Sequence, residues 1–129
     1  MELPTTSALA GAAAIMLVLL SLPIANHRRK NKLGAGDGGD ERFNAMIRAQ
    51  ANFTEYTPIG LIAIGLVELA GRPVLEVCWL AAILAAGRVL HAFGLTSGFI
   101  PARFLGMILT FTALLGAGGL LIARALGTL

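Results

Sequence analysis

Four long runs of apolar residues divide the 129-residue chain. A transmembrane α-helix needs about 20 mostly apolar residues, and each run is long enough to cross a bilayer. The pattern therefore predicts an all-α membrane protein whose whole chain, 1–129, forms one four-transmembrane-helix bundle. The expected spans are residues 8–26, 42–70, 74–95 and 101–126, with one long polar loop at 27–41.

Composition supports a membrane protein over a soluble one. Apolar residues make up 57% of the chain and charged residues only 13%, whereas a soluble domain carries about 25% charged residues. The single cysteine, Cys78, lies in an apolar run, which excludes a disulfide framework and a thiolate metal site. No basic residue precedes the first run, so a cleavable signal peptide is the less favoured interpretation of it.

Basic residues gather around the first polar loop and predict the orientation of the chain. They are Arg28, Arg29, Lys30, Lys32 and Arg42. An excess of lysine and arginine marks cytoplasmic loops. We therefore expect the loop 27–41 in the cytoplasm and both chain termini on the opposite side of the membrane.

A stripe of polar side chains enters the second span. At helical spacing, Arg48, Asn52 and Glu55 lie within about 60° of one another. Charged residues inside a membrane usually face a bundle interior or a wet cavity. A cationic pocket with one carboxylate would suit a ligand that has several carboxylates and one ammonium group. The alternatives are a structural Arg48–Glu55 network and, for arginines at helix ends, side chains that reach the lipid headgroups.

Two further polar residues, Arg88 and His91, share one face of the third span. A histidine in such a place is more often a satisfied interior residue than a catalyst. The runs of small residues at 80–87 and 114–121 indicate close helix–helix contacts.

The segment RAQANFTEYTP, residues 48–58, resembles the signature of the membrane-associated proteins in eicosanoid and glutathione metabolism, the MAPEG family. The motif R-x-x-x-N-x-x-E-Y-x-P carries the resemblance. Supporting elements are HRRK at the end of the first span, AGRVLHAFG in the third and an arginine that opens the fourth. The loop GDGG, 36–39, resembles that of the uncharacterised bacterial inner-membrane branch. The likeness covers nearly the whole chain.

The resemblance implies a homotrimer in the cell inner membrane that binds reduced glutathione between neighbouring subunits, with no metal or haem. It implies a glutathione transferase or peroxidase acting on lipophilic electrophiles or hydroperoxides by thiolate attack. Arg103 matches the arginine assigned to thiol activation. The residues implied to bind glutathione are Arg28 from the neighbouring subunit, Arg48, Gln50, Asn52, Glu55, Tyr56 and His91.

The chemistry of these residue types agrees with such roles. Glu55 can receive an ammonium group, and arginines pair with carboxylates. A permanently charged Arg103 would favour the thiolate, the form of a thiol that attacks. Three departures argue against prostaglandin synthesis and weigh against strong activity. Leu95 replaces a tyrosine of many active relatives, Phe104 replaces a serine of one prostaglandin-forming branch, and Ala51 replaces an arginine of that branch.

Two alternative functions stay open. The first is a membrane protein of the same fold that binds lipid or glutathione without chemistry. The second is a small four-helix multidrug exporter, which needs a glutamate in its first span to attract cations. The first span has no charge here, so the exporter is the less favoured of the two.

Overall fold

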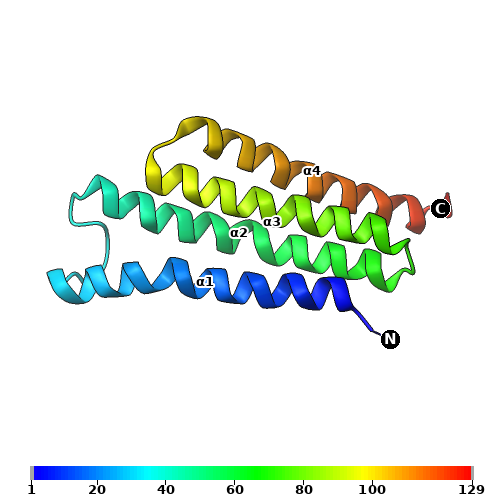
Figure 1. Cartoon of the computed structure of the whole chain (residues 1–129), viewed down its shortest axis with the longest axis horizontal. Helices are drawn as coiled ribbons and strands as arrows, with labels where there is room; N and C mark the ends of the chain where they lie inside the picture. The colour runs from blue at the N-terminus through cyan, green and yellow to red at the C-terminus, as the bar shows by residue number, and fades with distance from the viewer. Residues whose placement is uncertain (1, 129) are drawn as a thin grey trace.

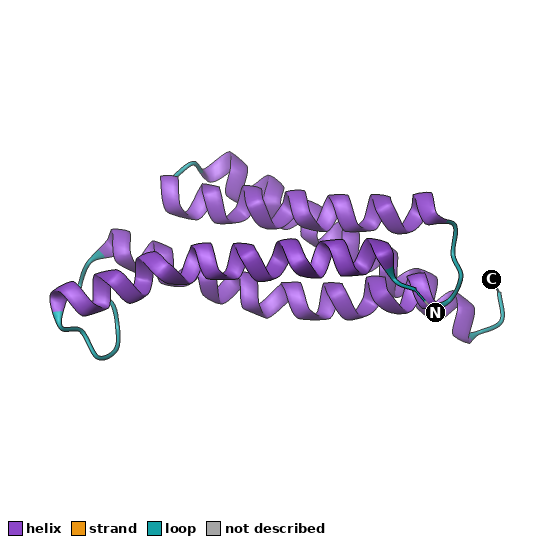
Figure 2. Cartoon of the chain, turned by 60° about the horizontal axis from the view of Figure 1, so that its bottom comes forward, coloured by secondary structure: helices purple, strands orange, loops and turns teal. Residues whose placement is uncertain are grey.

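The computed structural model describes residues 2–128, and within this range every regular element is an α-helix. The four helices lie side by side and alternate in direction (Figure 1). Loops are found only at the two ends of the bundle (Figure 2). The predicted four-helix, all-α fold class is confirmed. The helices are α1 (Pro4–Asn31), α2 (Glu41–Leu69), α3 (Val74–Ser97) and α4 (Ile100–Ala125).

The α1–α2 loop is shorter than the sequence suggested, because α1 continues through residues 27–31. Helix α1 ends where Lys32 takes a left-handed conformation, with φ of 52°. Helix α2 then begins with a capping bond in which the Asp40 carboxylate accepts from the Phe43 backbone N–H at 3.0 Å. A side-chain oxygen at this position satisfies one of the N–H groups that a helix start leaves without a partner.

The opposite end of the bundle fastens α1 to α2 through Glu68. Its carboxylate accepts from the backbone N–H groups of Thr5 at 3.0 Å and Thr6 at 2.8 Å. The Thr6 hydroxyl donates to the same carboxylate at 2.6 Å. A residue at the end of α2 thus caps the first turn of α1, where the helix dipole also favours a negative charge.

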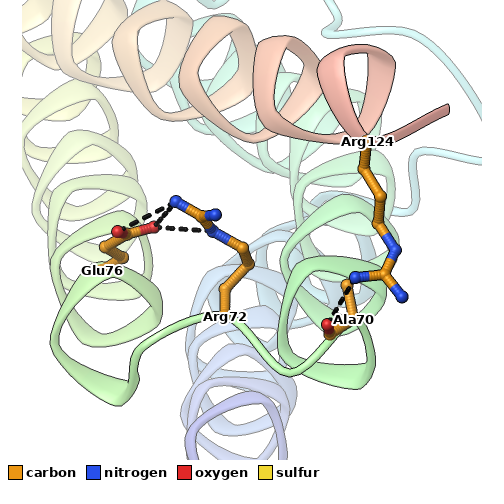
Figure 3. A network of polar contacts seen from close by, with 4 residues as sticks. All are labelled: Ala70, Arg72, Glu76 and Arg124. Carbon is orange, nitrogen blue, oxygen red and sulfur yellow. Dashed lines mark hydrogen bonds and ion pairs between the residues drawn. The ribbon is translucent and has the colours of Figure 1, made fainter. Parts of the chain in front are cut away.

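Two arginines hold the α2–α3 connection at this same end (Figure 3). Arg72 forms a bidentate ion pair with Glu76, the shortest N–O distance being 2.8 Å. Arg124, near the end of α4, donates to the Ala70 carbonyl at 2.6 Å. The end of α4 is therefore tied to the end of α2 across the turn (Figure 3).

Helices α3 and α4 approach closely because glycines stand at their contact. A Cβ atom on Gly87 would lie 2.9 Å from the Gly106 carbonyl oxygen. A Cβ on Gly94 would strike the backbone of Arg103, and one on Gly106 would strike the backbone of His91. Small residues let helix backbones approach in a membrane. Gly87 comes from one of the small-residue runs expected to do this, whereas Gly94 and Gly106 lie outside those runs.

Large apolar side chains cover the outside of the bundle. Ile15, Trp79 and Leu115 are more than 60% exposed. By length and composition α1, α3 and α4 could each cross a membrane. Helix α2 is as long, but the polar stripe occupies its first half. Its second half is mostly apolar and supplies Ile64 and Val67 to the core.

Candidate functional site

A polar cleft opens between α2, α3 and α4 at the end of the bundle that carries the α1–α2 loop. Its volume is about 360 Å³. Helix α2 contributes one continuous face at spacings of three and four residues, as expected of side chains on one side of a helix. The cleft is lined by Glu41, Asn44, Ala45, Arg48 and Asn52 from α2, His91 and Leu95 from α3, and Arg103 and Met107 from α4.

Four of the eight site residues predicted from the sequence line this cleft. They come from three different helices and are Arg48, Asn52, His91 and Arg103. Two arginines and one glutamate, Glu41, give the cleft a positive balance of formal charge. The arrangement suits an anionic ligand, because arginine forks bind carboxylates with two parallel hydrogen bonds.

The other predicted residues of α2 lie away from the cleft. The Gln50 amide nitrogen donates to the Ser21 hydroxyl at 2.8 Å and so turns toward α1. The Tyr56 ring lies 5.3 Å from the Arg88 guanidinium and packs against Phe111. Glu55 is exposed on the surface of the subunit.

The structural network between Arg48 and Glu55 does not form within the described subunit. Across residues 2–128, Arg72 forms an ion pair with Glu76, and His27 lies 3.8 Å from the carboxylate of Asp40. Both Arg48 and Glu55 are exposed. The stripe therefore keeps its charged ends available to other molecules.

Arg28 lies at the end of α1, on the loop side of the bundle. Its guanidinium is 5.6 Å from the centre of the Phe43 ring and donates to the Gly34 carbonyl at 3.4 Å. His27 stacks on the same ring at 3.9 Å. Within its own subunit, Arg28 therefore contacts the loop and the start of α2 but does not line the cleft.

His91 is buried, and its ring is fixed by α4. Its Nδ1 lies 3.0 Å from the Arg103 carbonyl oxygen. A carbonyl can only accept, so Nδ1 carries the proton in this bond and Nε2 is the nitrogen that remains to accept. The contact joins two predicted site residues through the backbone, which leaves the Arg103 side chain available to a ligand.

Arg88 is the residue behind the cleft that the sequence did not assign to the site. It is buried and bonds to α2 and α4 together: its Nη1 donates to Asn52 Oδ1 at 2.7 Å, and its Nε to Thr110 Oγ1 at 3.0 Å. The sequence did contain a signal for Arg88, because it is a charged residue in an apolar span, three residues before His91. Glu41 and Asn44 were also missed, although they extend the helical stripe of Arg48 by two turns.

An apolar groove between α1 and α3 adjoins this site. Its volume is about 590 Å³, and Leu19, Leu84 and Phe93 are among the side chains that line it. Arg88 also lines the groove, while its partner Asn52 lines the cleft. A hydrogen-bonded pair of residues thus separates a polar cavity from an apolar one.

Comparison with known proteins places the chain in a family. The model of the MAPEG family matches residues 6–123. The chain belongs to the MAPEG family. The resemblance found in the sequence motifs is therefore confirmed, and with it the assignment as a membrane-spanning helical bundle.

Two curated relatives support the assignment of the chain to the bacterial branch of the MAPEG family. The chain is 30% identical over 103 residues to the inner membrane protein YecN of Escherichia coli strain K12, an alignment that covers 80% of this chain and 79% of that protein. The YecN protein of Escherichia coli O6:H1 strain CFT073 gives the same identity and coverage. Within the described residues, no group of three or more histidine, cysteine or acidic side chains is placed to hold a metal ion.

Proposed function

We propose that this MAPEG protein binds reduced glutathione in the polar cleft and presents its thiolate to lipophilic electrophiles or hydroperoxides, as a glutathione transferase or peroxidase. One observation carries the proposal. Arg48, Asn52, His91 and Arg103, which are far apart in the sequence, line a single cleft with a surplus of positive charge. Glutathione has two carboxylates, one ammonium group and a thiol, and such a cleft matches the carboxylates and the thiolate.

Some residues of the cleft bind glutathione, and one activates its thiol. Arg48 pairs with a carboxylate of the tripeptide, and Asn52 forms a hydrogen bond to the tripeptide. Arg103 lies beside the thiol, where a fixed positive charge stabilises the thiolate over the neutral form. His91 lines the same cavity and orients the ligand by hydrogen bonding.

Two reactions are open to a thiolate in this position. In a transfer reaction, the sulfur attacks an electrophilic carbon, a C–S bond forms, and the leaving group departs with the bonding electrons. With a hydroperoxide, the sulfur attacks the terminal oxygen, the O–O bond breaks, and the alkoxide takes a proton to leave as an alcohol. A second glutathione then converts the resulting sulfenic acid to the disulfide, with release of water. The apolar groove on the other side of the Arg88–Asn52 pair offers an apolar surface that can bind the lipophilic partner near the cleft.

We propose a homotrimer in the inner membrane, with the cleft open to the cytoplasm and both termini on the other side. Glu55 and Tyr56 lie off the cleft of their own subunit and Arg28 lies on its loop side. Their roles in glutathione binding are therefore proposed across the contact between two subunits. The exposed apolar side chains of the helices serve both this contact and the bilayer.

A second candidate is binding without turnover, and one observation favours it. Leu95 lines the cleft, and the family resemblance aligns it with a tyrosine of many active relatives. A leucine cannot donate a hydrogen bond to a thiolate or to a leaving group, so this wall offers less help to the chemistry.

Calorimetry of the purified protein with glutathione and with S-hexylglutathione tests the proposal. We expect both to bind, because the carboxylate contacts are common to them. Conjugation of 1-chloro-2,4-dinitrobenzene and reduction of cumene hydroperoxide then distinguish an enzyme from a binding protein. If neither tripeptide binds, both candidate functions are contradicted.

A further inference from the structure

The guanidinium of Arg88 is a buried positive charge without a negative partner in the described subunit. The residue is 3% exposed. Across residues 2–128 its contacts are neutral groups: Asn52, Thr110, the Met107 sulfur at 3.6 Å and the Tyr56 ring. A buried charge is costly unless it is well hydrogen-bonded, and neutral partners leave its positive field in place. Arg88 therefore adds positive potential behind the cleft.

Thr110 holds one side of the guanidinium through a chain of hydrogen bonds with a fixed direction. Its hydroxyl donates to the Gly106 carbonyl at 2.8 Å. A threonine hydroxyl has a single proton to donate. The same oxygen must therefore accept from Arg88, whose Nε and Nη2 both point at it. This arrangement anchors Arg88 to α4.

The Nη1 side of the Arg88 guanidinium determines which end of the Asn52 amide faces Arg88. Arg88 Nη1 lies 2.7 Å from the side chain of Asn52 and also donates to its backbone carbonyl at 3.4 Å. The two ends of an asparagine amide are hard to tell apart by position alone. Arginine has only donors, however, so the end that faces Arg88 is the oxygen. The amide nitrogen of Asn52 is then the end left for the cleft.

The wall of the cleft around Asn52 consequently offers donors. The side chains of Arg48 and Arg103 carry only donor nitrogens, and the Asn52 amide adds an N–H group to the same cavity. We propose that Arg88 is a positioning residue that fixes this orientation, so that the cleft selects thiols by their carboxylate and carbonyl oxygens. The inference rests on the proposed function for the identity of the ligand, since it concerns how glutathione is recognised.

Two substitutions of Asn52 test the orientation directly. Asn52→Ala removes the donor, and we expect affinity for glutathione to fall about tenfold, as for the loss of a hydrogen bond to a charged group. Asn52→Asp keeps the bond from Arg88 but turns a negatively charged oxygen toward the cleft. We expect Asn52→Asp to bind more weakly than Asn52→Ala. Wild-type affinity in Asn52→Asp would mean that an oxygen faced the cleft from the start and would overturn the proposal.

A double-mutant cycle separates positioning from a general structural role. Arg88→Gln removes the obligate donor, and we expect it to weaken glutathione binding more in the wild-type background than in Asn52→Ala, where only the positive potential of Arg88 is left to lose. A structural role would weaken binding equally in both backgrounds and would overturn the proposal. Should Arg88→Gln fail to fold, which thermal unfolding in detergent would reveal, the comparison of Asn52→Asp with Asn52→Ala decides alone.

γ-Glutamylcysteine as a second probe distinguishes this inference from the proposed function. If γ-glutamylcysteine binds with the expected dependence on Asn52 while glutathione does not, the ligand of the proposed function is wrong and the inference stands. If glutathione binds but Asn52→Asp matches wild type, the inference is wrong and the proposed function stands. If neither thiol binds the wild-type protein, both are wrong.

Discussion

At the scale of single residues, the cleft depends on the charged side chains that line it. Arg48 and Arg103 are both exposed side chains that line the cavity, on α2 and α4. In the proposed function they differ in role: Arg48 holds a carboxylate throughout the reaction, whereas Arg103 stabilises a charge that forms only when the thiol ionises. Substitutions at the two positions should therefore change different measured quantities.

Replacing Arg48 with alanine should weaken glutathione binding about tenfold to a hundredfold, the usual cost of losing a hydrogen bond to a charged group. The Kd measured by calorimetry checks this. Arg29→Ala is the matched control, since Arg29 is an exposed arginine at the end of α1 that does not line the cleft. Equal losses in the two variants would mean that general positive charge, rather than the cleft, attracts the ligand.

Replacing Arg103 with alanine should raise the pH at which bound glutathione ionises, because the thiolate loses a nearby positive charge. The thiolate absorbance in the ultraviolet, followed against pH, gives the midpoint. The bond from His91 goes to the backbone carbonyl of Arg103, so the substitution should leave His91 in place. An unchanged midpoint would remove Arg103 from the activating role.

At the scale of helices, the site depends on how closely α3 and α4 pack. Glycines bring the two backbones into contact at Gly87, Gly94 and Gly106. Because His91 and Arg103 are part of this contact, the same packing that stabilises the helix pair places one wall of the cleft. The packing and the site are thus one structural feature.

Gly106→Ala should destabilise the protein by about 1–3 kcal/mol, since the new methyl group meets the backbone of His91 and forces the helices apart. Gly119→Ala is the control in the same helix, because a Cβ there has no neighbour within 4 Å. Thermal unfolding in detergent compares the two variants. A stable Gly106→Ala variant with wild-type glutathione affinity would show that the close approach is not required.

Glu68 of α2 attaches the first turn of α1 to the bundle. Leu9 and Ile24 are the buried residues of α1, and the hydrogen bonds of Glu68 add a polar attachment at its first turn. Glu68→Ala should cost about 1–2 kcal/mol, as for the loss of a helix cap. Glu76→Ala, which breaks a partly exposed ion pair at the same end, should cost less than about 1 kcal/mol. Unfolding midpoints in detergent measure both, and an equal loss in the two variants would contradict the capping role.

At the scale of the whole molecule, one subunit accounts for only part of the proposed glutathione site. Glu55, Tyr56 and Arg28 lie off the cleft in their own subunit, so their proposed roles need a neighbour. Light scattering of the protein in detergent should give three times the mass of the 13.4 kDa chain. Co-assembly of Arg28→Ala with Arg48→Ala subunits should restore glutathione binding to mixed trimers if the two residues serve one site from different subunits. A monomeric mass, or no restoration, would contradict the shared site.

The sequence by itself determined the four helices, the polar stripe of α2 and the family. Apolar runs of sufficient length can satisfy their backbone in a membrane only as helices, and helical periodicity places Arg48 and Asn52 on one face regardless of their surroundings. Tertiary structure decided the rest. Periodicity gives the angle of a side chain about its own helix but not the neighbour it meets. It therefore could not show that Gln50 turns to Ser21, that Glu55 stays on the surface, or that Arg88 is buried behind Asn52.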